Sequence, residues 1–507
     1  MKDFTQLVDL ASERLGGTVL AANDEYFAPK ENLLKPAKPI FIEDKYTDRG
    51  KWMDGWETRR RRTPGHDWCI IRLGLPGVVR GVVVDTSYFR GNFPSHCSIE
   101  ACAMEGSPSV DELTAADVRW REVLPKSELR GDTHNLFAID DRRRFTHLRF
   151  NIFPDGGVAR LRVHGEVVPD WKQFLTTGGA IDLAAVGHGG RPLACSDMFF
   201  SAPQNLLMPC AAANMGDGWE TQRRRGPGHD WAVLQLGIAG TIHQIEVDTT
   251  HFKGNYPESC SLEACGAEGA AEESLAEWPW KEVLPRSPLG PDRLHVFEKE
   301  LAAGGPATHV RFNIFPDGGV SRLRIIGAPS RDGRQREGLR WLNSLDGEAA
   351  QATLVNCCGA TRWVRGMLDA LPFAGLPQFF QKAEQFFAEL TREDWLEAFR
   401  HHPRIGEKKA AQAQSVQAQS WSKQEQSGVK VSTVETQAAL IEANRAYEAR
   451  FGYIFLVCAT GKSSDEMLAL LRERLQNDAE KEFHIAAGVR ATTGPSSSWA
   501  SPAPSTK

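Results

Sequence analysis

The chain has 507 residues and a net charge of −5; 41% of its residues are hydrophobic and 25% are charged. This length exceeds one ordinary core, so we expect about three domains of roughly 150 residues each. The charge gives no reason to expect nucleic acid as a partner, and no apolar run approaches the roughly 20 residues that span a bilayer. The N-terminus lacks the apolar core of a signal peptide. None of the ten cysteines forms a zinc-binding pattern, so we expect a cytoplasmic protein with reduced thiols.

Most of the chain is a tandem duplication. We expect an N-terminal segment at 1–19, followed by two copies of one domain at 20–168 and 193–330. MDGWETRRRRTPGHDW (53–68) returns as GDGWETQRRRGPGHDW (216–231), and RFNIFPDGGV occurs unchanged at 149–158 and 311–320. The period far exceeds the 20–50 residues of stacked repeats. The pattern therefore predicts a duplicated domain and not a solenoid.

Each copy has the pattern of an all-β domain. In the first copy, WCIIRLGL and VVRGVVVD are rich in β-branched residues and are predicted to be two strands joined through Pro76-Gly77. HLRFNIF and VARLRVHG flank a Pro-Asp-Gly-Gly turn in which Asp155, like Asp317 in the second copy, is more suited to forming the turn than to catalysis. Many short strands separated by Gly/Pro turns predict a β-sandwich or jelly roll for both copies.

The composition changes after the polar segment 330–338. Four following segments show the helical spacing of apolar residues, which predicts an all-α domain at about 339–490. SSDE, at 463–466, is a capping box at the start of one of these helices. The Ser/Pro-rich residues 491–507 are expected to be disordered.

Candidate functional residues of the duplicated domain lie in DGWETxRRRxPGHDW and on the strand before the PDGG turn. Arginine binds carboxylates and suits small, anionic, urea-like substrates, and adjacent His and Asp can act as an acid/base pair. The same string is equally explained by a turn and by structural Arg–carboxylate pairs. Glu100 and Glu263 lie within predicted strands and could face either a site or solvent. The candidates are His66, Asp67, His229 and Asp230 for catalysis, and Arg60, Arg223, Arg149 and Arg311 for substrate binding.

These duplicated motifs resemble allantoicase over about residues 10–330. The resemblance implies two jelly-roll, galactose-binding-like domains that hydrolyse allantoate to ureidoglycolate and urea, within purine breakdown. Such a reaction needs an acid to protonate the departing nitrogen and a base to activate water. No His/Asp spacing in the sequence demands a metal, so the divalent-metal requirement of this part stays open. A galactose-binding-like fold also leaves open a carbohydrate-binding β-sandwich protein.

The helical segment contains HHPRIG (401–406) and SKQEQSG (422–428). From the pattern alone, His402 is a surface histidine on a turn that Pro403 imposes. Together with CCGATRWVRGMLDALPF, these motifs resemble the decarboxylase of 2-oxo-4-hydroxy-4-carboxy-5-ureidoimidazoline (OHCU), over about 339–487. The resemblance implies an all-α bundle that forms (S)-allantoin without a cofactor. It further implies the roles of the motif residues: His402 and its partner Glu425 as catalytic, and Pro403, Ser422 and Gln426 as substrate-binding.

The end of the chain departs from the decarboxylase pattern. Family members continue after EFHIAAG with a basic final helix that supplies a substrate-contacting arginine. Here the chain reads VRATTGPSSSWASPAPSTK, in which Arg490 is the only arginine. We therefore expect a bifunctional enzyme acting on small ureides, without nucleic-acid or membrane partners and as a homo-oligomer. The atypical tail leaves open impaired decarboxylation, or a helical domain that serves only as a scaffold or oligomerisation module.

Overall fold

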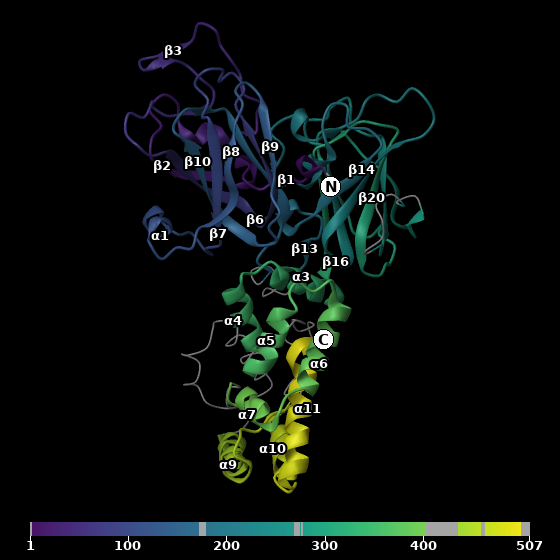
Figure 1. Ribbon diagram of the computed structural model, residues 1–507. Helices are drawn as coiled ribbons and strands as arrows, with labels where there is room; N and C mark the ends of the chain where they lie inside the picture. Colours follow the sequence, from purple (N-terminus) through teal and green to yellow (C-terminus); the bar gives the residue numbers. More distant parts are fainter. Residues whose placement is uncertain are drawn as a thin grey trace. The chain divides into compact units, whose positions relative to one another are not determined.

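The computed structural model describes residues 3–171, 179–267, 274, 277–401, 434–457 and 462–497. The chain divides into two compact units, 1–333 and 334–507. The first unit contains two β-sandwiches and the second is helical (Figure 1). This is the predicted fold class. No helix among these residues is long and apolar enough to cross a membrane.

The first repeat is built around one long strand, β6. Its N-terminal half pairs with β2 and β10, and its C-terminal half pairs with β9 and β12, so that β6 belongs to both layers of the sandwich. The elements are β1 (Val8–Asp9), β2 (Thr18–Ala22), β3 (Tyr46–Thr47), β4 (Gly50–Lys51), β5 (Trp56–Glu57), β6 (Asp67–Asp85), β7 (His96–Cys102), α1 (Val110–Thr114), β8 (Arg121–Glu128), β9 (His134–Ala138), β10 (Arg144–Phe153), β11 (Gly157–Val158) and β12 (Arg160–Val167).

The continuity of β6 corrects the prediction of two strands. Pro76-Gly77 does not end the strand; the register of β6 against β10 shifts between Arg72 and Gly77, and the strand bends there. Gly74 lies within the bend, where a Cβ atom would come within 2.6 Å of the backbone of Leu15 and Gly17. The bend therefore lets one strand serve both layers while the N-terminal loop passes close beside it.

The second repeat has the same topology. β16 pairs with β14 and β20 in its first half and with β19 and β22 in its second half. The strands are β13 (Ile181–Asp182), β14 (Arg191–Cys195), β15 (Trp219–Glu220), β16 (Asp230–Asp248), β17 (Ser259–Cys265), β18 (Lys281–Pro288), β19 (Leu294–Phe297), β20 (Ala307–Phe315), β21 (Gly319–Val320) and β22 (Arg322–Pro329).

Both sheets begin earlier in the chain than the sequence boundaries suggest. β1 pairs with β12, and its counterpart β13 pairs with β22, so that residues 8–19 and 181–192 are parts of the two sandwiches. The strands β1 and β13 are only two residues long, too short to show an alternating pattern.

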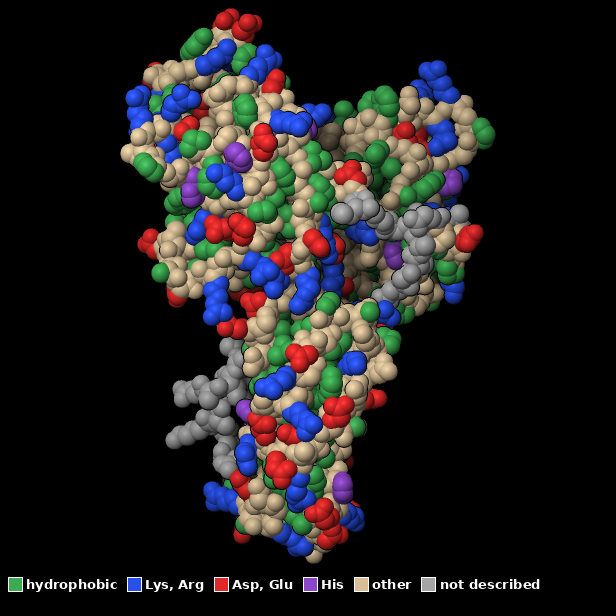
Figure 2. Space-filling model, in the orientation of Figure 1, with side chains coloured by type: hydrophobic (Ala, Val, Ile, Leu, Met, Phe, Trp, Pro, Cys, Tyr) green, Lys and Arg blue, Asp and Glu red, His purple; other side chains and the backbone are tan. Residues whose placement is uncertain are grey.

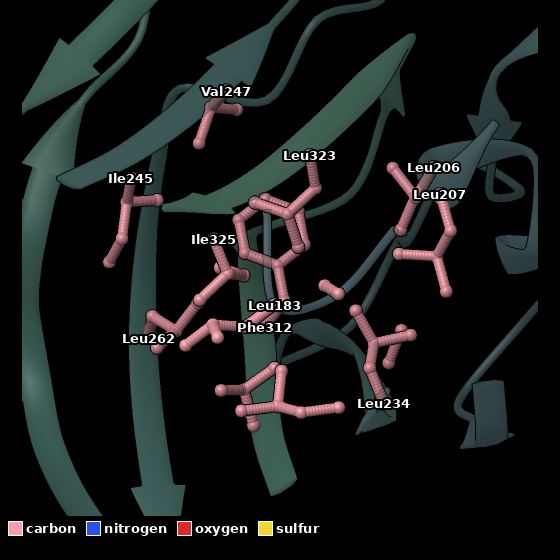
Figure 3. Packing of buried hydrophobic residues seen from close by; sticks show 14 of the residues in the cluster. Leu183, Leu206, Leu207, Leu234, Ile245, Val247, Leu262, Phe312, Leu323 and Ile325 are labelled. Atoms are coloured by element: carbon pink, nitrogen blue, oxygen red, sulfur yellow. The ribbon is translucent and has the colours of Figure 1, made fainter. Parts of the chain in front are cut away.

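Each sandwich encloses an apolar core. In the second repeat, side chains from both layers meet around Phe312, with Leu234, Leu262 and Ile325 packed nearby (Figure 3). Trp56 and Trp219 are fully buried at equivalent positions, and each indole N–H donates to a backbone carbonyl. Leu15 of the first repeat packs into the core cluster of the second. The two repeats therefore share apolar contacts.

The predicted Pro-Asp-Gly-Gly turn is confirmed in both repeats. It links β10 to β11 and β20 to β21. The carboxylate of Asp155 accepts a hydrogen bond from the backbone N–H of Arg61 at 2.8 Å, and Asp317 accepts one from Arg224 at the same distance. The aspartates of the turn thus anchor the arginine-rich loop that precedes β6 and β16.

The second unit packs its helices around buried aromatic residues that include Trp363, Phe399 and Tyr447. Ser463 and Glu466 form the predicted capping box at the start of α10. Helix α11 continues seven residues beyond residue 490, the predicted end of the domain. The helices are α3 (Arg331–Asn343), α4 (Gly347–Cys357), α5 (Thr361–Asp369), α6 (Leu376–Ala388), α7 (Arg392–Arg400), α9 (Val434–Phe451), α10 (Ser464–Arg474) and α11 (Ala479–Ser497).

Candidate active site

A polar cluster lies on the outer face of the sheet in each repeat. In the second repeat, Phe312 and Ile314 of β20 point into the core, so the alternation of the strand places Arg311 and Asn313 on the opposite face. The neighbouring strand β17 adds Ser261 and Glu263, which oppose these two residues in register. We call Ser261, Glu263, Arg311 and Asn313 the second-repeat cluster.

The second-repeat cluster is fully connected. Arg311 donates two parallel hydrogen bonds to Glu263, from Nε at 2.6 Å and from Nη2 at 2.7 Å. The side-chain amide of Asn313 donates to Ser261 and to Glu263, both at 3.1 Å. Its carbonyl oxygen lies 3.3 Å from Nε2 of His229. A loop histidine is therefore joined to a carboxylate on the sheet through one asparagine.

Glu263 is held in its charged form. Burial alone would raise its pKa, but hydrogen bonds from Arg311 and Asn313 outweigh burial and keep the pKa below its ordinary value. Both Glu263 and Arg311 remain partly exposed. An ionised, accessible carboxylate of this kind can accept N–H donors from a ureido group.

The first-repeat cluster consists of the equivalent residues Ser98, Glu100, Arg149 and Asn151, and it is less tightly connected. Arg149 makes a single contact of 3.4 Å to Glu100. Asn151 donates to Ser98 at 3.1 Å and to Glu100 at 3.3 Å. Asn151 is only 4% exposed, yet its carbonyl oxygen has no hydrogen-bond partner within the described part of the chain.

Aromatic rings flank both clusters. The guanidinium of Arg149 lies 4.6 Å from the ring centre of Trp120, and that of Arg311 lies 5.1 Å from Trp280. His66 and His229 lie against Phe153 and Phe315, with ring centres 4.7 and 4.6 Å apart. These rings hold the arginines and histidines beside the clusters and supply flat apolar surfaces that suit a planar ureido group.

The aspartates that follow the two loop histidines in sequence are buried in pairs with other side chains. Asp67, the first residue of β6, is 1% exposed, and its carboxylate accepts hydrogen bonds from Arg61 at 2.6 Å and from Asn23 at 2.9 Å. Asp230 is equally buried and pairs with Arg224 and Ser196. Among the described residues these carboxylates bond to arginine, asparagine and serine side chains and not to the preceding histidines.

The four arginines predicted to bind substrate lie in two different parts of each repeat. Arg149 and Arg311 belong to the clusters. Arg60 and Arg223 are exposed on the loop that leads to His66 and His229. Neither makes a hydrogen bond with any residue that the structure describes, which leaves both guanidinium groups available to an anionic ligand.

Three further pairs of residues were missed by the sequence reasoning: Asn151 and Asn313, Ser98 and Ser261, and Trp120 and Trp280. The available signal was spacing. Ser and Glu are two residues apart in CSIEAC and CSLEAC, and Arg and Asn are two residues apart in RFNIF. In a strand, residues two apart share a face. Identical spacing on two paired strands in both copies marks a shared surface.

The predicted decarboxylase residues His402, Pro403, Ser422, Glu425 and Gln426 lie outside the described residues, between His401 and Val434.

The described part of the helical unit contains a buried polar network. Glu482 of α11 accepts hydrogen bonds from Arg474 and Asn477, at 2.8 and 2.7 Å, and from the hydroxyl of Tyr447. This network ties α11 to α9 and α10.

The fold and the site define a duplicated jelly-roll protein with one polar cluster in each copy, joined to a helical domain. The family model described as the allantoicase repeat matches residues 8–168 and 181–330, so the chain belongs to the allantoicase family. A second model, described as OHCU decarboxylase, matches residues 343–489. The chain is therefore a bifunctional enzyme of ureide catabolism.

Relatives and solved structures agree with this assignment. A probable allantoicase from Pseudomonas paraeruginosa is 53% identical over 329 residues, which cover 64% of this chain and 97% of that protein. The allantoicase of Dictyostelium discoideum is 48% identical over 63% of this chain and 87% of its own length. The crystal structure of allantoicase from Saccharomyces cerevisiae matches with a TM-score of 0.54 and 39% identity, over 63% of this chain and 92% of that one.

No group of three or more His, Cys, Asp or Glu side chains within the described ranges is arranged to hold a metal ion.

Proposed function

We propose that the outer-face clusters are the sites at which the allantoicase part hydrolyses allantoate to ureidoglycolate and urea. The observation that carries this proposal is the duplicated Arg–Glu–Asn–Ser network beside a loop histidine. A sheet exterior has no structural need for an ion pair and a buried amide at the same place. Partly exposed charged groups held by hydrogen bonds are typical of a site organised for a polar ligand.

The chemistry follows from the groups present. In the second repeat, Glu263 accepts the N–H donors of a ureido group or takes a proton from the attacking water. His229 is placed to donate a proton to the departing nitrogen. The C–N bond to the central carbon breaks, a water oxygen binds that carbon, and urea leaves. Arg223, exposed on the same loop, is available to the substrate carboxylate.

The two sites differ in how firmly hydrogen bonds hold the glutamate of each cluster before substrate binds. Glu263 is fixed by two bonds from Arg311 at 2.6 and 2.7 Å, whereas Glu100 receives one contact of 3.4 Å from Arg149. Groups held in place before substrate arrives stabilise a transition state more effectively than groups that must reorganise. We therefore assign the larger share of turnover to the second repeat.

The test is urea release from allantoate by the full-length protein, with and without added divalent metal. Glu263→Gln keeps the shape of the side chain and removes its charge, and kcat should fall by about 100-fold. The matched control is Glu298→Gln, the same substitution at an exposed position on the second repeat, which should retain full activity. Unchanged turnover in Glu263→Gln, at unchanged thermal stability, would contradict the proposed site.

For the helical domain we propose decarboxylation of OHCU to (S)-allantoin, with His402 and Glu425 in the catalytic roles and Pro403, Ser422 and Gln426 binding substrate. The support is the match of the OHCU decarboxylase model over residues 343–489. Fresh uricase product can be supplied to wild-type protein and to His402→Ala, and the chirality of allantoin followed. Equal rates in the two proteins would favour the scaffold alternative, in which this domain has no catalytic role.

A further inference from the structure

A basic side chain lies near the loop histidine of each repeat, at one end of the polar cluster. WREVLPKS of the first repeat corresponds to WKEVLPRS of the second, so Lys126 of β8 is the counterpart of Arg286 of β18. The ammonium nitrogen of Lys126 lies 4.6 Å from the ring centre of Phe153. The guanidinium carbon of Arg286 lies 4.3 Å from that of the equivalent Phe315. Neither basic residue takes part in the chemistry proposed above.

Arg286 extends the row of polar groups that the second-repeat cluster begins. Phe315 follows Asn313 by two residues on β20, so the two side chains share the outer face of the sheet. The ring of His229 lies against Phe315, with centres 4.6 Å apart, and its Nε2 lies 3.3 Å from the carbonyl oxygen of Asn313. Residues two apart on a strand are separated by about 6.6 Å, a distance that one small ureide can bridge. The contacts therefore run from Glu263 past the histidine to the guanidinium of Arg286.

The guanidinium of Arg286 is held by the protein along one edge. Its Nε donates to the hydroxyl of Ser259 at 2.7 Å, and Ser259 is only 5% exposed. The contact with the ring of Phe315 holds the other side of the group. Nη1 has no hydrogen bond with any residue that the structure describes, and Nη2 has a long ion pair of 3.9 Å with the exposed Glu258. The side chain is 56% exposed, so both terminal nitrogens are available to a ligand.

Two terminal nitrogens on a fixed plane match the two oxygens of a carboxylate. Arginine binds carboxylates through two parallel N–H···O bonds, and bonds between charged groups are roughly twice as strong as neutral ones. Lysine offers a point charge on a flexible stem and has no such fork. Allantoate carries one carboxylate beside two neutral ureido groups. Arg286 is therefore suited to the one charged group of this substrate.

The first repeat lacks the anchor that holds Arg286. His96 occupies the position equivalent to Ser259, and its Nδ1 lies 3.0 Å from the hydroxyl of Ser95. Lys126 makes no hydrogen bond or ion pair with any residue in the described ranges, and its contact is with the ring of Phe153. The cationic group of the first repeat is therefore less firmly positioned than that of the second.

The surface gives no broad attraction for an anion. The chain has a net charge of −5. Figure 2 shows charged side chains of both signs interspersed over the visible surface, and neither sign dominates it. Selection of an anionic substrate therefore depends on individual, positioned groups and not on long-range attraction.

We propose that Arg286 binds the carboxylate of the substrate and thereby places one ureido C–N bond between Glu263 and His229. This inference rests on the function proposed above. Arg223 is also exposed, but no described residue anchors its side chain, so it would lose more conformational freedom on binding the carboxylate. Lys126 has the same role in the first repeat and binds the carboxylate less tightly.

Urea release from allantoate by the full-length protein tests the proposal. All variants are made in a Glu100→Gln background, which suppresses turnover by the first repeat. Arg286→Gln should raise KM by about 100-fold and change kcat much less, because the lost bonds are made to a group that does not react. Arg286→Lys should recover part of the loss. The control Lys299→Gln removes an exposed positive charge elsewhere on the second repeat and should leave KM unchanged.

The primary amide of allantoate separates recognition of the carboxylate from a purely structural role of Arg286. The parent protein should prefer allantoate to the amide by about 100-fold in kcat/KM, and Arg286→Gln should use the two compounds almost equally. An unchanged preference in Arg286→Gln, or a larger loss of preference in Arg223→Gln, would overturn the inference. Because Glu263→Gln tests the proposed function independently, loss of turnover there with an unchanged KM in Arg286→Gln would overturn this inference alone.

Discussion

The two repeats of the allantoicase part share a topology but differ in how their polar groups are paired. In the second repeat every group of the cluster is bonded, from Arg311 through Glu263 and Asn313 to His229. In the first repeat the same series of hydrogen bonds ends at Asn151, whose carbonyl oxygen lacks a partner among the described residues. Duplication has therefore kept the residues at both sites while allowing their geometry to diverge.

The largest effect on stability should come from the buried ion pair beneath each GWE motif. Arg160 is 2% exposed and pairs with Asp54 at 2.7 Å, whereas Asp217 of the second repeat is partly exposed and is shared by Arg322 and Arg14. Asp54→Asn leaves a buried arginine without a counter-ion and should lower the free energy of unfolding by about 3 kcal/mol or more. Asp217→Asn should cost less.

Hydrogen exchange with mass spectrometry can measure this difference because it reports each repeat separately. Faster exchange confined to first-repeat peptides in Asp54→Asn is the expected result. Equal acceleration of both repeats by either variant would show that the two sandwiches unfold as one unit.

The stability of the two repeats should depend differently on pH because of His147 in the first repeat. Burial, reinforced by Arg72 on the neighbouring strand, lowers the pKa of His147 to about 4. The equivalent strand pairing in the second repeat places Gln235 opposite His309. Below pH 6.5 the imidazole of His147 binds a proton in the unfolded chain but stays neutral in the folded chain. The first repeat should therefore lose stability as pH falls from 6.5 towards 4, by up to about 3 kcal/mol.

Denaturant titrations at several pH values test this dependence. His147→Asn removes the titrating group and should flatten the profile over that range. Arg72→Gln, which copies the second repeat, should make the slope shallower. A profile that is unaffected by either substitution would assign the acid sensitivity to other groups.

The smallest effect on stability is expected from substitutions of the loop histidines. His229 lies 3.3 Å from the carbonyl oxygen of Asn313, whereas the contact that His66 makes within the described part of the chain is with the ring of Phe153. His229→Ala should therefore cost about 1 kcal/mol of stability from the lost hydrogen bond, and His66→Ala measurably less. Thermal unfolding of the two variants compares them directly, and a larger loss in His66→Ala would contradict the difference in pairing.

Much of the fold could be predicted because its signals are local. Repeated motifs revealed the duplication, β-branched runs and Gly/Pro turns indicated the sandwiches, and Ser463 with Glu466 marked the start of α10. The continuity of β6 could not be predicted, because Pro76-Gly77 has the sequence of a turn and is accommodated by strand pairing on both sides of the bend.

The site was harder to predict than the fold. Arg149 and Arg311, which the position before the PDGG turn marks as candidates, lie in the two clusters, and their role in substrate binding remains a prediction. Asp67 and Asp230 appeared suitable for catalysis because each follows a histidine. Their burial against Arg61 and Arg224 depends on which way the first residue of a strand points, and that is set by tertiary packing.

The central claim is that both outer-face clusters bind allantoate and that the second is the better organised. The most direct measurement compares Glu100→Gln with Glu263→Gln for urea release from allantoate, at matched thermal stability. We expect kcat to fall by about 100-fold in Glu263→Gln and by less than about 10-fold in Glu100→Gln. Full activity in both variants would exclude the clusters as the site, and a larger loss in Glu100→Gln would reverse the assignment of the repeats.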